Sequence, residues 1–249
     1  MEIRLHEGEE FIMELIPHPA SFLDLYGFFF YLVMLGAWLI AGHPGLPEAE
    51  QYSFAAAAVG VLVPCVWAAV TRIRWRWLFF GILLVAASGV AYYQFGPRAV
   101  GVPIVAAGLL GIPLTDAYRR SHRYYVTSER IVMRAGLITR EVREVRLSRV
   151  VDVVLIQGLL GRIFNFGTIF PVTPSALGTG QDLAMLGLRG DVIEIAGGRT
   201  VVVPRGRSSQ VLYGVTNPDE VYSELSRLLR EREEVTYLKK ILEKLDEKS

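Results

Sequence analysis

Four long apolar stretches in the first half of the 249-residue chain constrain its fold more than any other feature. An α-helix needs roughly 20 apolar residues to cross the ~30 Å hydrocarbon core of a bilayer. The fourth stretch contains Pro103 and Pro113, which predict breaks in that helix. We expect a bundle of four transmembrane helices, at residues 22–41, 54–70, 77–95 and 100–117.

The loops between these stretches differ in charge, which predicts the orientation of the chain. The loop at residues 42–53 contains Glu48 and Glu50 but no Lys or Arg. The loop between the second and third stretches and the segment after the fourth stretch are rich in Arg. Basic segments of this kind stay on the cytoplasmic side of a membrane. We therefore expect a multi-pass protein of the cell membrane with both termini in the cytoplasm. The basic residues that face lipid headgroups would be Arg72, Arg74, Arg76, Arg119, Arg120 and Arg123.

The predicted spans carry no Asp, Glu, Lys, Arg or His at mid-depth; Asp24 and Asp116 lie at span ends. Such residues inside a membrane usually mark ion or proton routes. The spans therefore read as an anchor or a partner-binding bundle rather than a pore. Small residues also predict close helix packing, at Ala56, Gly60, Ala107 and Gly111.

Beyond Ser121 the apolar residues alternate, which is typical of strands. Residues 159–164 look like a single helical turn, and Asn217-Pro218 opens a helix with apolar positions at Val221 and Leu225. We expect a leader at residues 1–21 and a mainly-β domain at residues 121–230. Its strands would be Arg123–Thr127, Arg130–Ala135, Arg140–Val145, Val150–Ile156, Gly167–Val172, Val192–Ala196 and Thr200–Pro204.

Several short motifs in this half resemble one family. They are YYVTSERI from Tyr124, VRLSRVV from Val145, QGLLGR from Gln157 and GVTNPDEVY from Gly214, and the leader adds GEE from Gly8. Their order and spacing resemble the bacterial and archaeal pleckstrin-homology-like membrane-flanking domain. The resemblance implies about seven antiparallel strands forming a barrel that a C-terminal helix caps. It implies no catalytic residues.

Arginines dominate the start of this domain: residues 118–149 contain nine Arg but only three Glu. A basic surface beside a bilayer attracts anionic headgroups. Strands alternate, however, so half of these arginines could simply be solvated outer positions. Both interpretations stay open for Arg140, Arg143 and Arg146. Nucleic acid is a poor candidate partner, because Tyr124 and Tyr125 read as strand core.

The last segment, residues 231–249, is a charged helical tail with an apolar stripe. Such a helix could pair with a second copy of the chain, bind a partner or lie on the membrane. The other interpretation is a frayed helix end, because charges interrupt the stripe. The residues of the stripe are Leu238, Leu242 and Leu245.

Chemistry-bearing residues are scattered. The four histidines have no metal-ligand spacing, Cys65 lies in an apolar stretch, and no serine has a nucleophile-elbow setting. We expect no metal, no cofactor and no catalysis.

The leading hypothesis is a membrane-anchored, non-catalytic scaffold that binds proteins or anionic lipid headgroups at the inner leaflet. Its partner would be a second copy or another membrane protein. One alternative is a small transporter or an accessory subunit of a transport complex. Another is a membrane enzyme, which would require His122, Asp116 and a further polar residue to converge.

Overall fold

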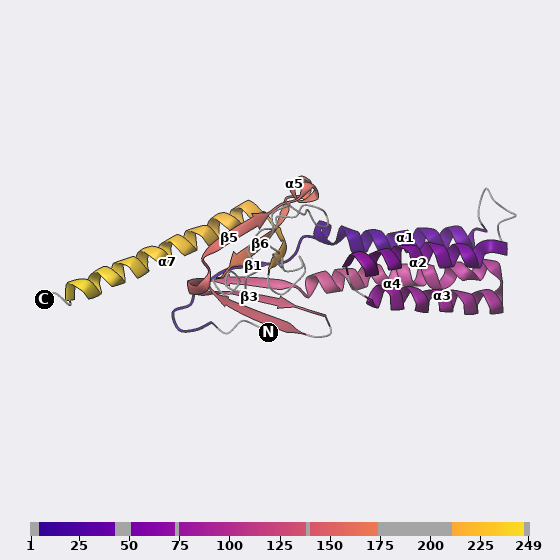
Figure 1. Cartoon of the computed structure of the whole chain (residues 1–249), viewed down its shortest axis with the longest axis horizontal. Helices are drawn as coiled ribbons and strands as arrows, with labels where there is room; N and C mark the ends of the chain where they lie inside the picture. Colours follow the sequence, from indigo (N-terminus) through magenta and orange to yellow (C-terminus); the bar gives the residue numbers. More distant parts are fainter. Residues whose placement is uncertain (1–4, 43–50, 73–74, 138–139, 174–210, 247–249) are drawn as a thin grey trace, which may run out of the picture. The chain divides into compact units, whose positions relative to one another are not determined.

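The computed structural model describes residues 5–42, 51–72, 75–137, 140–173 and 211–246 (Figure 1). The chain divides into two compact units. Residues 22–116 form the helical unit. Residues 1–21 and 117–249 together form the sheet domain, so the helical unit is an insertion within the sequence of that domain.

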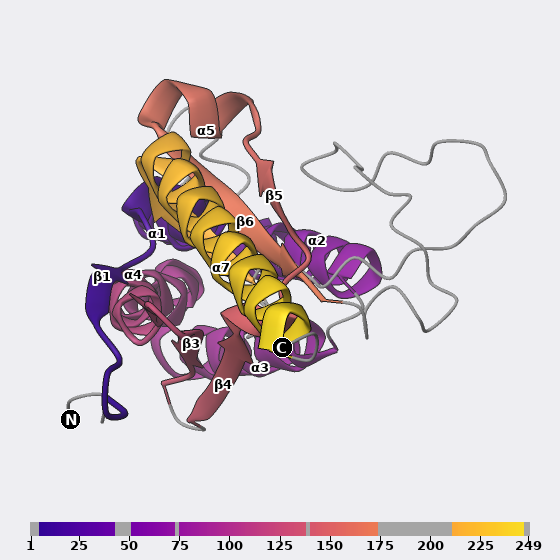
Figure 2. The same ribbon diagram turned by 90° about the vertical axis from the view of Figure 1, so that its left-hand side faces the viewer.

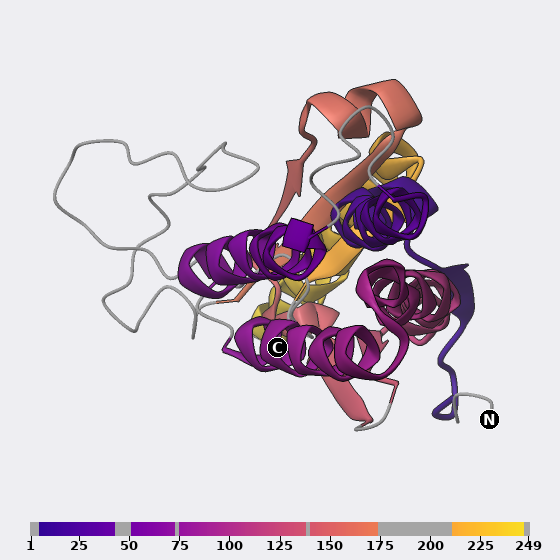
Figure 3. The same cartoon turned by 90° about the vertical axis from the view of Figure 1, so that its right-hand side faces the viewer.

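The helical unit contains α1 (Leu23–Ile40), α2 (Ser53–Arg72), α3 (Arg76–Phe95) and the greater part of α4 (Gly101–Arg120). Figure 3 shows these helices nearly end-on. All four are long and apolar enough to cross a membrane, and their bounds lie within a few residues of the predicted spans. The predicted breaks in the fourth helix are wrong, since α4 continues through both Pro103 and Pro113. Pro103 lies in the first turn, where no helical N–H bond is lost.

Glycines allow α1 and α4 to approach closely. A Cβ atom added at Gly101 would lie 2.2 Å from the Gly36 carbonyl oxygen, and one at Gly111 would lie 2.0 Å from the Phe29 ring. Gly60 of α2 is similarly covered by Leu35. The close packing predicted at Gly60 and Gly111 is confirmed. Around these contacts lie the buried side chains of Leu32, Leu39, Ala57, Val61, Cys65, Leu84, Val100 and Ile104.

The sheet domain has two antiparallel sheets. The first has the order β1-β2-β3-β4 and the second has the order β5-β6-β7. Antiparallel hairpins join β2 to β3 and β3 to β4, with Val126 opposite Ile131 and Ala135 opposite Glu141. The strands are β1 (Phe11–Leu15), β2 (Arg123–Thr127), β3 (Arg130–Ala135), β4 (Glu141–Arg146), β5 (Asp152–Ile156), β6 (Phe166–Val172) and β7 (Leu212–Thr216).

The leader is not separate from the domain. Its strand β1 pairs with β2, with Leu15 opposite Tyr124, although four helices separate the two strands in the sequence. Neither β1 nor β7 was predicted, because short strands without clear alternation become strands only through their partners. The strands predicted at residues 192–196 and 200–204 lie outside the described residues.

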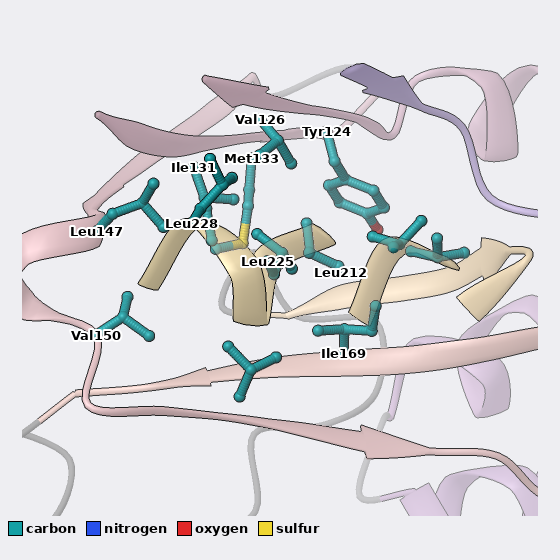
Figure 4. Close-up of a cluster of buried hydrophobic side chains, with 13 residues drawn as sticks. Tyr124, Val126, Ile131, Met133, Leu147, Val150, Ile169, Leu212, Leu225 and Leu228 are labelled. Atoms are coloured by element: carbon teal, nitrogen blue, oxygen red, sulfur yellow. The ribbon is translucent and has the colours of Figure 1, made fainter. Parts of the chain in front are cut away.

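One long helix, α7 (Pro218–Asp246), closes the domain. The sequence suggested a domain helix and a separate tail, but α7 is continuous through residues 230 and 231. It packs against β5 and β6, and Figure 2 looks along it. Its residues Leu225 and Leu228 meet Ile131 and Met133 of β3 and Leu212 of β7 in a single buried cluster (Figure 4). The predicted helical turn is α5 (Leu159–Phe164).

Candidate functional site

A polar pocket of about 370 Å³ opens in the sheet domain. Its walls come from the leader, the β2–β3 turn, β3, the end of β4, the short 3-10 helix Leu147–Arg149 and α7. The side chains are almost all charged or hydrogen-bonding. They belong to His6, Glu129, Arg130, Glu144, Arg146, Ser148 and Arg232.

Arg130, one of the lining residues, belongs to a buried ion pair. The Arg130 Nε and Nη2 atoms lie 2.9 and 3.0 Å from the Glu9 Oε1 and Oε2 atoms, which is a bidentate pair. The Arg130 Nη1 atom lies 2.7 Å from the Glu144 Oε2 atom. The Glu9 side chain is fully buried and that of Arg130 is 10% exposed. The two carboxylates hold the planar guanidinium of Arg130 in one orientation.

Further donors complete the environment of Glu9. The Thr127 hydroxyl donates to the Glu9 Oε1 atom at 2.6 Å, and the His6 backbone N–H donates to Oε2 at 2.8 Å. Burial alone would raise the pKa of Glu9, but the hydrogen bonds from Arg130, Thr127 and His6 outweigh it and lower the pKa from 4.5 to about 2. Glu9 is therefore ionised under physiological conditions, and it holds the Arg130 guanidinium in place beside the pocket.

The rim of the pocket is open. Glu129, Arg146 and Ser148 are exposed, and the side chains of Glu129 and Arg146 make no hydrogen bond or ion pair to another described residue. Arg232 of α7 instead donates to the Ser128 carbonyl oxygen, at 2.9 and 3.2 Å, and so ties α7 to the β2–β3 turn. The rim thus presents one anionic and one cationic group that a ligand could meet together.

Two of the predicted headgroup arginines contact the leader. Arg119 donates to the Pro17 carbonyl oxygen at 2.9 Å, which joins α4 to the leader. Arg123 pairs with Glu14 across β2 and β1 at 3.0 Å, and this hydrogen bond raises the Arg123 pKa. These contacts give both arginines a structural role in fastening the leader.

The other predicted headgroup arginines lie at helix ends. Arg120, the last residue of α4, and Arg76, the first residue of α3, are exposed. Arg72 ends α2, but its side chain lies outside the description, as does Arg74 altogether. Arg76 and Arg120 are therefore the two whose exposure fits headgroup contact.

Of the three arginines predicted around the fourth strand, Arg146 lines the pocket, whereas Arg140 and Arg143 do not. Among the described strands, β4 lies at the edge of its sheet, and it begins at Glu141, one residue later than predicted, so Arg140 precedes it. Arg143 lies opposite Met133 on β3 and does not line the pocket. Only Arg146, opposite Arg130, lines the pocket.

His122 and Asp116, which a membrane enzyme would need, each form a hydrogen bond with a tyrosine residue. His122 is buried with its Nδ1 atom 2.8 Å from the Tyr118 carbonyl oxygen, and the Tyr26 hydroxyl donates to Asp116 at 3.2 Å. Within the described part of the chain, no three His, Cys, Asp or Glu side chains are grouped as metal ligands would be. In the tail, Leu238 is exposed on α7, whereas the side chains of Leu242 and Leu245 lie outside the description.

Sequence reasoning missed the pocket because its residues are far apart in the chain. Glu9 and Arg130 are separated by 121 positions, and a leader glutamate next to another acid looks like a solvated charge. Arg232 appeared only as an interruption of the tail stripe. The available signal was the GEE motif of the leader, which belonged to the family resemblance but carried no indication of burial.

The chain is similar to a known protein family. The family model described as "Bacterial PH domain" matches residues 28–181, more than half of the chain. No curated protein matches the chain, and no solved structure matches it.

Proposed function

Because this chain belongs to the bacterial PH domain family, we propose that it is a membrane-anchored, non-catalytic scaffold. Its four apolar helices would hold the sheet domain at the inner leaflet of the cell membrane. There the domain would bind a partner protein, while basic residues at the helix ends contact anionic headgroups.

One observation carries this proposal: β1 and β2, which flank the four apolar helices in the sequence, are neighbouring strands of one sheet. Only two residues separate α4 from β2, at Ser121 and His122. A chain that leaves a sheet, crosses a bilayer and returns to the same sheet must cross an even number of times. Four spans satisfy this condition, and they would place both termini on one side.

The charge of the loops supports the cytoplasm as that side. Arg76 begins α3 and Arg120 ends α4. With four spans in this order, both of these helix ends would lie on the same side as the sheet domain. The opposite loop at residues 42–53 contains no Lys or Arg. Basic residues near span ends are retained in the cytoplasm and are attracted to anionic lipids.

The pocket favours a protein segment as the ligand of the domain. Its rim offers both an acid, Glu129, and a base, Arg146. An anionic headgroup would be repelled by the acid, whereas a peptide with side chains of both signs could pair with both. The pocket also lies at the far end of β2 from Arg123, roughly 14 Å along a strand that starts beside α4.

Charge reversal tests the pocket. Proteins cross-linked to the full-length chain in native membranes would be recovered and compared among wild type, Glu129→Arg, Arg146→Glu and the matched control Arg149→Glu. Arg149 is exposed on the neighbouring 3-10 helix but does not line the pocket. A partner lost from both pocket variants and kept by the control supports the proposal. A partner set identical in all four proteins contradicts it.

Orientation and lipid contact need separate measurements. A reporter fused at Ser249 should read out in the cytoplasm, and an external readout would overturn the orientation. Binding of phosphatidylglycerol to the purified full-length chain should fall with salt and with Arg76→Gln and Arg120→Gln. The full chain is required, because a fragment beginning at Ser121 lacks β1 and Glu9.

A further inference from the structure

The helix α5 exposes an apolar surface that the fold of the domain leaves uncovered by described residues. Its side chains Leu159, Leu160, Ile163 and Phe164 are between 45% and 77% exposed. A single exposed leucine is ordinary, but four large apolar side chains on a six-residue helix form a contiguous patch. Such patches usually mark a surface that contacts something other than water.

The apolar side chains of α5 are exposed although the helix itself is firmly held by the rest of the domain. A Cβ atom at Gly161 would lie 2.4 Å from the Phe166 carbonyl oxygen, so α5 packs closely against the start of β6. Gln157 donates to the Gly161 carbonyl oxygen at 3.1 Å. Asn165, the left-handed residue that ends α5, donates to the Asn217 side chain at 2.8 Å. The helix is therefore fastened at both ends while its apolar side chains point outward.

The place of α5 within the sheet domain indicates what covers the patch. Phe166, two residues after α5 ends, stacks on the His18 ring with 5.7 Å between ring centroids. The His18 backbone N–H also donates to the Gly214 carbonyl oxygen at 2.7 Å. From His18 the chain passes through the 3-10 helix Pro19–Phe22, which rises about 8 Å, into α1. The patch thus lies at the end of the domain from which the first apolar helix departs.

We propose that α5 inserts into the lipid surface of the membrane, with its leucine, isoleucine and phenylalanine side chains at the headgroup–acyl boundary. This inference rests on the proposed function, because it requires the chain to be anchored by its spans. Arg162 is exposed on the same helix and would reach the phosphate layer, an arrangement typical of interfacial segments. The insertion would fix the domain against the bilayer at a third point, besides its two chain connections.

Depth measurements in a bilayer test the insertion. The full-length chain with Cys65→Ala would carry a nitroxide at Ile163→Cys or, as the matched control, at Val151→Cys. Val151 is similarly exposed, at 59% against 65% for Ile163, but precedes β5, whereas α5 follows that strand. The vesicles would contain phosphatidylcholine with a minority of phosphatidylglycerol. The ratio of oxygen to nickel-complex accessibility should be several-fold higher at Ile163 than at Val151.

Two results would overturn the insertion. Equal ratios at both sites would place Ile163 in water. Shielding of Ile163 from both oxygen and nickel would indicate a protein cover, such as a second copy, another part of this chain or a partner.

Photoactivatable phosphatidylcholine tests the unmodified sequence as well. Cross-links in the α5 peptide as well as the spans support the insertion, and cross-links confined to the spans oppose it.

These outcomes are distinguishable from a failure of the scaffold itself. A chain removed from vesicles by an alkaline wash would contradict the membrane anchor and with it the proposed function. A chain that resists the wash but has Ile163 in water would contradict only the insertion of α5. Loss of partner recovery in the pocket variants does not depend on either result.

Discussion

The helical unit and the sheet domain are stabilised in different ways. In the helical unit, each helix is an apolar stretch that forms a helix by itself, and glycines such as Gly36 and Gly101 set how closely the helices approach. In the sheet domain, the decisive contacts join distant segments. Glu9 and Arg130 form a buried ion pair across an insertion of four helices.

The helical unit and the sheet domain are sensitive to different kinds of substitution. Close packing of small residues fails when volume is added, while a buried ion pair fails when one charge is removed. The two units should therefore respond to different substitutions.

Removing Arg130 should have the largest effect. Arg130→Met leaves Glu9 buried without its cation, and breaking a buried pair from one side costs about 3–5 kcal/mol. Hydrogen exchange of the full chain in detergent should show β1, β2 and β3 losing protection while α2 and α3 keep theirs. The double variant Glu9→Met/Arg130→Met should recover much of the loss, because no buried charge is left. Equal destabilisation of single and double variants would mean that shape, rather than charge, governs the site.

Acid should weaken the domain before the helical unit. The Glu9 pKa is about 2 in the folded domain and 4.5 in its ordinary state, so the folded form favours the ionised carboxylate. This stabilisation, about 3 kcal/mol at most, is complete above pH 4.5 and is lost as the pH falls through 2. Thermal unfolding measured across that window should show the decline, and Glu9→Gln should flatten it. The described helices α2 and α3 contain no acid and should keep their exchange protection.

Adding volume should affect only the helical unit. Gly101→Val would force a side chain against the Gly36 carbonyl oxygen, and overpacking of this kind costs about 1–3 kcal/mol. Gly27→Val in α1 is the control, because a Cβ atom there has no neighbour within 4 Å. Thermal stability in detergent should fall for the first variant and not for the second. Similar values for both would refute tight packing of α1 against α4.

Removing an exposed charge should have the smallest effect. Glu14 pairs with Arg123 only five positions beyond Glu9, but both side chains are well exposed. Exposed pairs contribute about 0.2–1 kcal/mol and are screened by salt. Glu14→Gln should therefore lower the free energy of unfolding slightly in a chemical denaturation series. A cost as large as that of Arg130→Met would contradict burial as the source of the difference.

The sequence predicted the helical unit well because each helix is encoded locally. A run of about 20 apolar residues has the length that a membrane-spanning helix requires, and the predicted bounds differ from α1–α4 by only a few residues. In the same way, the strands β2 and β3 and the helix α5 were predicted at their observed bounds, since alternation or a short apolar turn defines each of them.

The sheet domain was predicted less completely because much of it depends on pairing at a distance. The strand β1 has little alternation, and it becomes a strand because β2 offers hydrogen bonds to it. The pocket depends on the same pairing, which brings Glu9 to Arg130. A pattern of arginines indicated a basic surface, yet Arg119, Arg123 and Arg130 all contact leader residues. No pattern along one sequence distinguishes an arginine that binds lipid from one that fastens a strand.

The pairing of β1 with β2 also has a consequence for synthesis. Glu9 and Thr127, which share a hydrogen bond in the finished domain, are separated by 118 positions. At about 5–20 residues per second, a ribosome takes roughly 6–24 s to reach Thr127 after it has made Glu9. Throughout that interval β1 has no strand to pair with, while the four helices between it and β2 are being made. The first strand of this domain must therefore be kept from aggregating until all four helices have been made.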